Sequence, residues 1–169
     1  MVLLDAQPAD AFTALPDFPA FYNSIPTVSA LFTPLARLGI FRLANTSVGF
    51  GDLPPAARDA ERADQSSPRN YAAQRNEFSV LRTTLQQALA LTTIGDRPLV
   101  VITAASEAQA GWVDAQDKMA KLSTNSSHRV LAEETHTSLI ESEHGAAEST
   151  RAILEVVGAA RSGAKVPDR

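Results

Sequence analysis

The residue best suited to catalysis is His136, because neutral imidazole accepts a proton readily near neutral pH. It stands in the sequence Thr-His-Thr-Ser, after the sequence HRVL at residues 128–131, which predicts a short strand. A histidine works as a general base when a carboxylate orients its second ring nitrogen and stabilises the imidazolium that forms. The sequence offers two candidate carboxylate partners, Asp5 and Glu107.

Both candidate acids follow an apolar run. Asp5 comes directly after the sequence VLL at residues 2–4, and Glu107 lies in the polar loop after the sequence LVVIT at residues 99–103. Because the carboxyl ends of parallel strands meet at one edge of a sheet, either acid is expected near His136. The structural alternative for each is a turn or capping residue.

The elements that position these residues alternate between strand and helix. Continuous or β-branched apolar runs predict strands at residues 2–4 and 99–103, and the sequence HRVL at residues 128–131 predicts a further short strand. Helical spacing predicts helices at about 112–122 and 146–161, with frayed residues beyond Ser162. This order predicts an α/β fold, in which a single domain over residues 1–169 holds a short parallel sheet of about three strands.

Residues 8–95 contain no convincing strand and are predicted to form a mainly helical insert. Prolines are expected to break its helices at positions 16, 19, 26, 34, 54, 55 and 68. Apolar residues recur at helical spacing within 28–40 and 71–89, which usually indicates core, and the functional alternative is a lid over a hydrophobic substrate. Five of its arginines are expected on a solvent-exposed face: Arg58, Arg62, Arg69, Arg75 and Arg82.

Composition excludes several classes of function. The 169 residues carry a net charge of -4 with interspersed signs, so nucleic acid is not an expected partner. Cysteine is absent and the three histidines lack metal-ligand spacing, so no metal and no cofactor are expected. Apolar stretches fall well short of the ~20 residues that cross a bilayer, and no secretory leader is recognised, which predicts a cytoplasmic chain.

Several segments together resemble the closing portion of α/β-hydrolases. The opening VLLDA, residues 2–6, is similar to the strand that follows the nucleophile-bearing helix of that family. Further resemblance lies in Pro98–Ala104 (PLVVITA), Gly111-Trp112 with Gln116, Leu122-Ser123, Ser127-His128-Arg129-Val130, Thr135-His136-Thr137-Ser138-Leu139, Ala152-Ile153 and Val156-Val157. The likeness covers nearly the whole chain.

The resemblance implies a partial α/β-hydrolase fold in which residues 8–95 form the cap or lid. It also implies hydrolysis of a small, hydrophobic ester, amide or lactone with His136 as general base. The family usually offers an aspartate after its penultimate strand, whereas this loop reads TAASEA, so Asp5 is favoured over Glu107 as the acid. The family's Gly-x-Ser-x-Gly nucleophile elbow is missing, and with it the oxyanion loop, so the chain alone is expected to be inactive.

The competing hypothesis is a non-catalytic remnant or accessory module that binds a protein or a hydrophobic ligand. A sheet lacking its other half exposes a strand edge, which predicts a homodimer or a partner at that edge. Trp112 is expected to pack, with a place on the substrate side as the alternative. His128 and His144 are expected to be structural or surface residues.

Overall fold

The computed structural model describes residues 1–43 and 51–168. The chain divides into two compact units, one formed by Met1–Pro16 with Leu85–Arg169 and the other by Asp17–Thr84. The predicted insert, 8–95, is wider than the second unit, because residues 8–16 and 85–95 belong to the first. Each unit is therefore described separately.

The first unit is built on a short parallel sheet. Its strands are β1 (Val2–Leu4), β2 (Leu99–Ala104) and β3 (Ser126–Leu131), in the order β1-β2-β3. Val2 pairs with Val100, and Leu99 pairs with Ser126. The predicted mixed α/β class with three parallel strands is confirmed, and β3 begins two residues earlier than expected.

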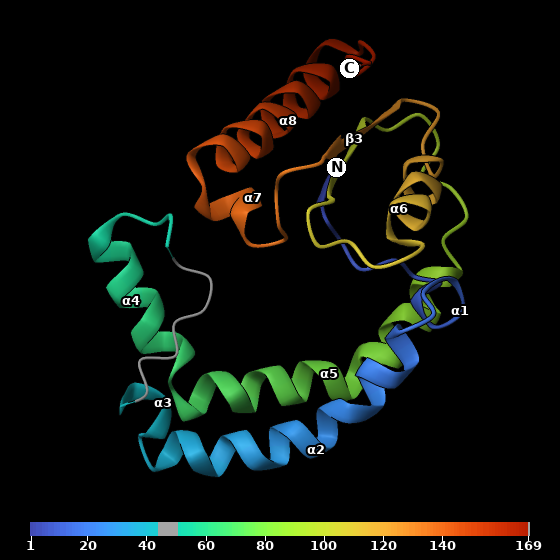
Figure 1. Cartoon of the computed structure of the whole chain (residues 1–169). Helices are drawn as coiled ribbons and strands as arrows, with labels where there is room; N and C mark the ends of the chain where they lie inside the picture. Colours follow the sequence, from blue (N-terminus) through green and yellow to red (C-terminus); the bar gives the residue numbers. More distant parts are fainter. Residues whose placement is uncertain (44–50, 169) are drawn as a thin grey trace. The chain divides into compact units, whose positions relative to one another are not determined.

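Helices cover both faces of this sheet, which is why every residue of β2 is buried. Because side chains alternate along a strand, Val100, Ile102 and Ala104 pack on the face of α8 (Glu143–Ser162). Leu99 and Val101 pack on the opposite face with Ala120, the last residue of α6 (Trp112–Ala120). Figure 1 shows α6 and α8 on either side of the strands.

The start of α6 is fixed by a close contact with the segment that holds α1 (Ala11–Ala14). Gly111 caps α6 with φ 82°, and a Cβ atom there would lie 2.8 Å from the carbonyl oxygen of Ala14. A side chain is therefore excluded by both backbone conformation and space. This contact places Trp112 as the first residue of α6.

The C-terminal segment differs from the prediction in three ways. A short helix, α7 (Ser138–Glu141), was not predicted, and α8 begins at Glu143 because Ser142 caps it by accepting the N–H of Gly145. The prediction that the residues beyond Ser162 are frayed is wrong for Val166. Val166 is buried, and its N–H donates to Asn125 Oδ1 at 2.8 Å.

The second unit is helical. It contains α2 (Phe18–Arg37), α3 (Ile40–Leu43), α4 (Pro55–Gln65) and most of α5 (Pro68–Leu89), which ends before Gly95. The helix breaks expected at Pro26 and Pro34 are wrong, because α2 runs through both. Aromatic side chains of α2 and α5 are in contact, such as Phe21 with Phe78 at 6.2 Å between ring centroids.

Within residues 1–43 and 51–168, no helix has both the length and the hydropathy needed to cross a membrane.

Candidate active site

Asp5 lies at the carboxyl end of β1 and has an unusual backbone conformation. Its φ is 44°, in the left-handed region that residues other than glycine rarely adopt. Its N–H donates to the carbonyl oxygen of Ile102 at 2.7 Å, so the neighbouring strand holds the peptide in place. Aspartate tolerates this region better than most residues, and such conformations are concentrated at functional sites.

The carboxylate of Asp5 is 5% exposed and contacts three elements. Oδ1 accepts hydrogen bonds from the backbone N–H of Ala104 at 3.2 Å and from the indole N–H of Trp112 at 2.6 Å. Oδ2 lies 2.9 Å from Nδ1 of His136. The end of β2, the start of α6 and the loop after β3 therefore meet at one buried charge.

His136 is held on one side only. Its side chain is 71% exposed, and Nε2 has no hydrogen-bond partner in the described part of the chain. An ionised carboxylate only accepts hydrogen bonds, so a neutral ring that bonds to it donates from Nδ1 and carries its lone pair on the exposed Nε2. This is the arrangement that a general base needs: one ring nitrogen oriented, the other open.

Of the two candidate acids, the structure brings only Asp5 to His136. Glu107 is exposed, and no contact joins it to His136 among the described residues. Trp112 was expected to pack or to line the substrate side, and instead its N–H orients the acid. The signal in the sequence was its position at the start of the helix after β2, since that end of the helix adjoins the carboxyl edge of the sheet.

A second acid–histidine pair is formed by Glu134 and His144, which lie on either side of His136 in the sequence. This pair was not predicted from the sequence. Glu134 is buried, and its Oε1 lies 2.7 Å from Nδ1 of His144, whose side chain is 70% exposed. Its Oε2 accepts hydrogen bonds from the hydroxyls of Ser138 and Ser142. The bond from Ser138, and after it that from His144, holds the pKa of Glu134 below its usual value. Glu134 in turn raises the pKa of His144.

The Glu134 cluster, which consists of Glu134, Ser138, Ser142 and His144, also anchors the loop that carries His136. The carbonyl oxygen of Glu134 accepts the N–H of Ser106 at 3.1 Å. Thr135 and Ser138 exchange bonds between backbone N–H and hydroxyl at 2.8 and 3.2 Å. The residues on both sides of His136 are therefore fixed by local hydrogen bonds.

The third histidine forms a chain of contacts that is similar in order to a catalytic triad. Nε2 of His128 lies 2.8 Å from the hydroxyl of Thr103, and Nδ1 lies 3.5 Å from Asp117, whose pKa is lowered mainly by a hydrogen bond from Lys121. Thr103 is 0% exposed in the middle of the sheet. Because the hydroxyl is buried, this chain of contacts lacks the exposed nucleophile that a triad needs.

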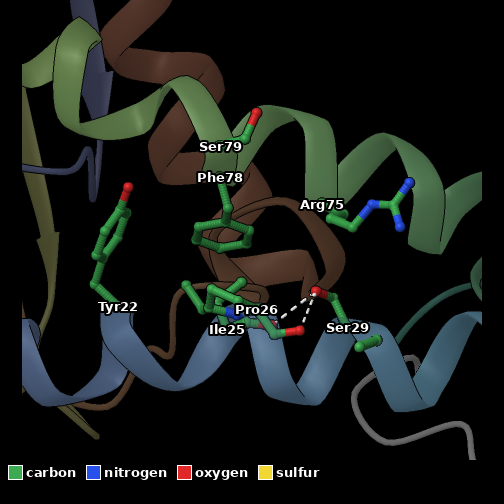
Figure 2. Close-up of a pocket in the computed structure, with 8 residues that line it drawn as sticks. Tyr22, Ile25, Pro26, Ser29, Arg75, Phe78 and Ser79 are labelled. Carbon is green, nitrogen blue, oxygen red and sulfur yellow. Dashed lines mark hydrogen bonds between the residues drawn. The ribbon is translucent and has the colours of Figure 1, made fainter.

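A separate candidate site lies in the helical unit. A cavity of about 250 Å³ opens between α2 and α5, and mainly apolar side chains line it, as Figure 2 shows. Across residues 1–43 and 51–168, no group of three or more His, Asp or Glu side chains is placed to hold a metal ion.

Comparison of the chain with protein-family models, with curated proteins and with solved structures gave no match.

Proposed function

We propose that the Asp5–His136 pair is the acid and the general base of a serine hydrolase that cleaves an ester, amide or lactone. The observation that carries the proposal is geometric: a buried carboxylate lies 2.9 Å from Nδ1 of His136, and Nε2 is exposed. In this reaction, Nε2 takes the hydroxyl proton as a serine oxygen attacks the carbonyl carbon, and then delivers that proton to the leaving group. Asp5 stabilises the imidazolium between the two steps.

The parallel sheet supports a partial α/β-hydrolase fold as the framework of this site. Asp5 follows the first strand, His136 follows the third, and the order β1-β2-β3 brings both to one edge. That edge is where open parallel sheets bind ligands.

The proposal requires a serine nucleophile and oxyanion donors, and the sequence contains no Gly-x-Ser-x-Gly elbow. We propose that another segment of a longer protein, or a partner chain, supplies both. Without them, the histidine has no alkoxide to generate, and the chain alone is expected to show no esterase turnover.

The experiment begins with the coding sequence immediately upstream of Met1, read in frame for a strand followed by Gly-x-Ser-x-Gly. The complete product is then tested against p-nitrophenyl esters and a fluorophosphonate probe. We expect the fluorophosphonate probe to label the serine. We also expect ester turnover, which His136→Ala should abolish. Absence of an elbow both upstream and in any co-purifying chain, or turnover that survives His136→Ala, would contradict the proposal.

The second candidate function is binding of a hydrophobic ligand without catalysis. The apolar cavity between α2 and α5 favours it. A chain that binds such a ligand, while no complete product reacts with the fluorophosphonate probe, would replace the first proposal with the second.

A further inference from the structure

The cavity of the helical unit has a mainly apolar wall, and its two serine hydroxyls are hydrogen-bonded within their own helices. Ile25, Pro26 and Phe78 supply its apolar surface. The hydroxyl of Ser29 donates to the carbonyl oxygen of Ile25 at 2.7 Å, and that of Ser79 donates to its own helix at 2.6 Å. Because both hydroxyls are already used, the wall favours an apolar group over a polar one.

One arginine lines this cavity, and a second lies against the ring of Tyr22, which is itself part of the lining. Arg75 lines it and has no hydrogen bond or ion pair among the described residues. Arg82 lies two helical turns further along α5, with its guanidinium carbon 5.3 Å from the ring centroid of Tyr22. Figure 2 shows Tyr22 at one end and Arg75 at the other, with Phe78 between them.

The charge of the two helices is opposite to that of the chain. Helix α2 contains no acidic residue, and α5 contains three arginines and one glutamate, whereas the whole chain carries a net charge of -4. A local excess of positive charge in an acidic protein attracts anions. Charge complementarity therefore points to a ligand with a negative head group.

We propose that this cavity binds a medium-chain alkyl carboxylate, with its chain against Phe78 and its carboxylate on Arg75. A guanidinium binds a carboxylate through two parallel hydrogen bonds, which are about twice as strong as bonds between neutral groups. The cavity, at about 250 Å³, is smaller than the roughly 300–1,000 Å³ of sites for drug-sized ligands, which favours a single alkyl chain. Such an acid is also the product expected from an acyl ester, although the site does not depend on the proposed hydrolase function.

The test uses the whole chain and isothermal titration calorimetry below the micelle concentration of each probe. Decanoate is compared with decanol, which has the same chain without charge, and with decyltrimethylammonium, which has the opposite charge. We expect saturable binding of decanoate about tenfold tighter than that of decanol, and no saturable binding of the cation.

Three variants separate the head group from the chain. Arg75→Gln should weaken decanoate about tenfold and leave decanol unchanged. Arg69→Gln removes the same charge from an exposed position of α5 outside the lining, and should change the Kd of decanoate less than twofold. Ala30→Phe fills the cavity and should abolish binding of both probes, with circular dichroism verifying that the helices are retained.

The proposal is overturned if no probe binds saturably, if decanol binds as tightly as decanoate, or if Arg69→Gln weakens decanoate as much as Arg75→Gln. Sedimentation with anionic phosphatidylglycerol vesicles distinguishes a free acid from a membrane surface. The proposal would also be overturned if the chain bound the vesicles but not free decanoate, and if Arg75→Gln and Ala30→Phe did not change its binding to the vesicles.

Discussion

The two acid–histidine pairs of this protein are alike in their local geometry and different in what surrounds them. In each pair, a buried carboxylate lies close to Nδ1 of a histidine whose side chain is about 70% exposed. The distance is 2.9 Å for Asp5 with His136 and 2.7 Å for Glu134 with His144. Distance and exposure alone therefore do not separate a catalytic pair from a structural one.

The partners of each acid make the distinction. The other contacts of Asp5 are the backbone of Ala104 and the indole of Trp112, which come from distant parts of the chain. Those of Glu134 are hydroxyls within eight residues, at the start of α7 and α8. Asp5 is thus positioned by the fold at the sheet's ligand-binding edge, whereas Glu134 fastens a turn and the helix that follows it.

The largest expected difference between the two pairs is in catalysis. In the complete hydrolase, His136→Ala and Asp5→Asn should each lower kcat/KM by about 10³-fold or more. His144→Ala should lower it less than about tenfold, because His144 only fastens the turn. Steady-state kinetics with a p-nitrophenyl ester measure all three. Equal losses for His144→Ala and His136→Ala would erase the proposed distinction.

The next effect is on stability and concerns the packing of α8 on α7. A Cβ atom at Gly145 would lie 2.2 Å from the carbonyl oxygen of Ser138, so Gly145→Ala must push α8 away from α7. We expect a loss of about 3 kcal/mol in the free energy of unfolding. Gly158→Ala, in the same helix with open space around it, should instead gain about 0.5–1 kcal/mol. Urea unfolding followed by circular dichroism compares them, and similar effects at both positions would contradict the packing of α7 on α8.

A smaller loss is expected from Glu134→Gln. This change removes the negative charge that accepts bonds from Ser138, Ser142 and His144, and should lower the free energy of unfolding by about 1–2 kcal/mol. Glu107→Gln is the matched control on an exposed loop and should change it by less than about 0.5 kcal/mol. An unchanged value for Glu134→Gln in urea unfolding would show that the cluster does not fasten the turn.

The smallest effect is a dependence on pH. His144 has a raised pKa, so its contribution is fully present below its usual pKa of 6.5 and is lost as the pH rises through the raised value. Glu134 has a lowered pKa, so its contribution is fully present above its usual pKa of 4.5 and is lost as the pH falls through the lowered value. The difference in Tm between the wild type and His144→Gln should therefore be largest between pH 4.5 and 6.5.

The control for this pH dependence is the comparison of Glu134→Gln with the double variant Glu134→Gln/His144→Gln. Their difference in Tm should vary little with pH, because His144 no longer faces a charge at Glu134. A wild-type difference that grows above pH 6.5 would contradict the sign of the pKa shift.

The sheet and the Asp5–His136 contact could both be predicted from the sequence, and for the same reason. Continuous apolar runs mark buried parallel strands, and parallel strands deliver the residues after them to one edge. The position of Trp112 at the start of its helix was visible in the sequence, but its hydrogen bond to Asp5 also depends on the close contact between Gly111 and Ala14, which no sequence pattern shows.

Two other features were missed for different reasons. The four residues of α7 are too few for helical spacing, so the Glu134 cluster built around them was missed. The passage of α2 through Pro26 and Pro34 is a case in which packing between helices overrides local preference.

The most direct test of the central claim is the tautomer of His136 in this chain. Long-range ¹H–¹⁵N NMR at a pH where the ring is neutral should show the proton on Nδ1 and a free lone pair on Nε2, and Asp5→Asn should abolish that preference. A proton on Nε2, or a mixture of tautomers that Asp5→Asn does not change, would contradict the assignment of His136 as a base oriented by Asp5.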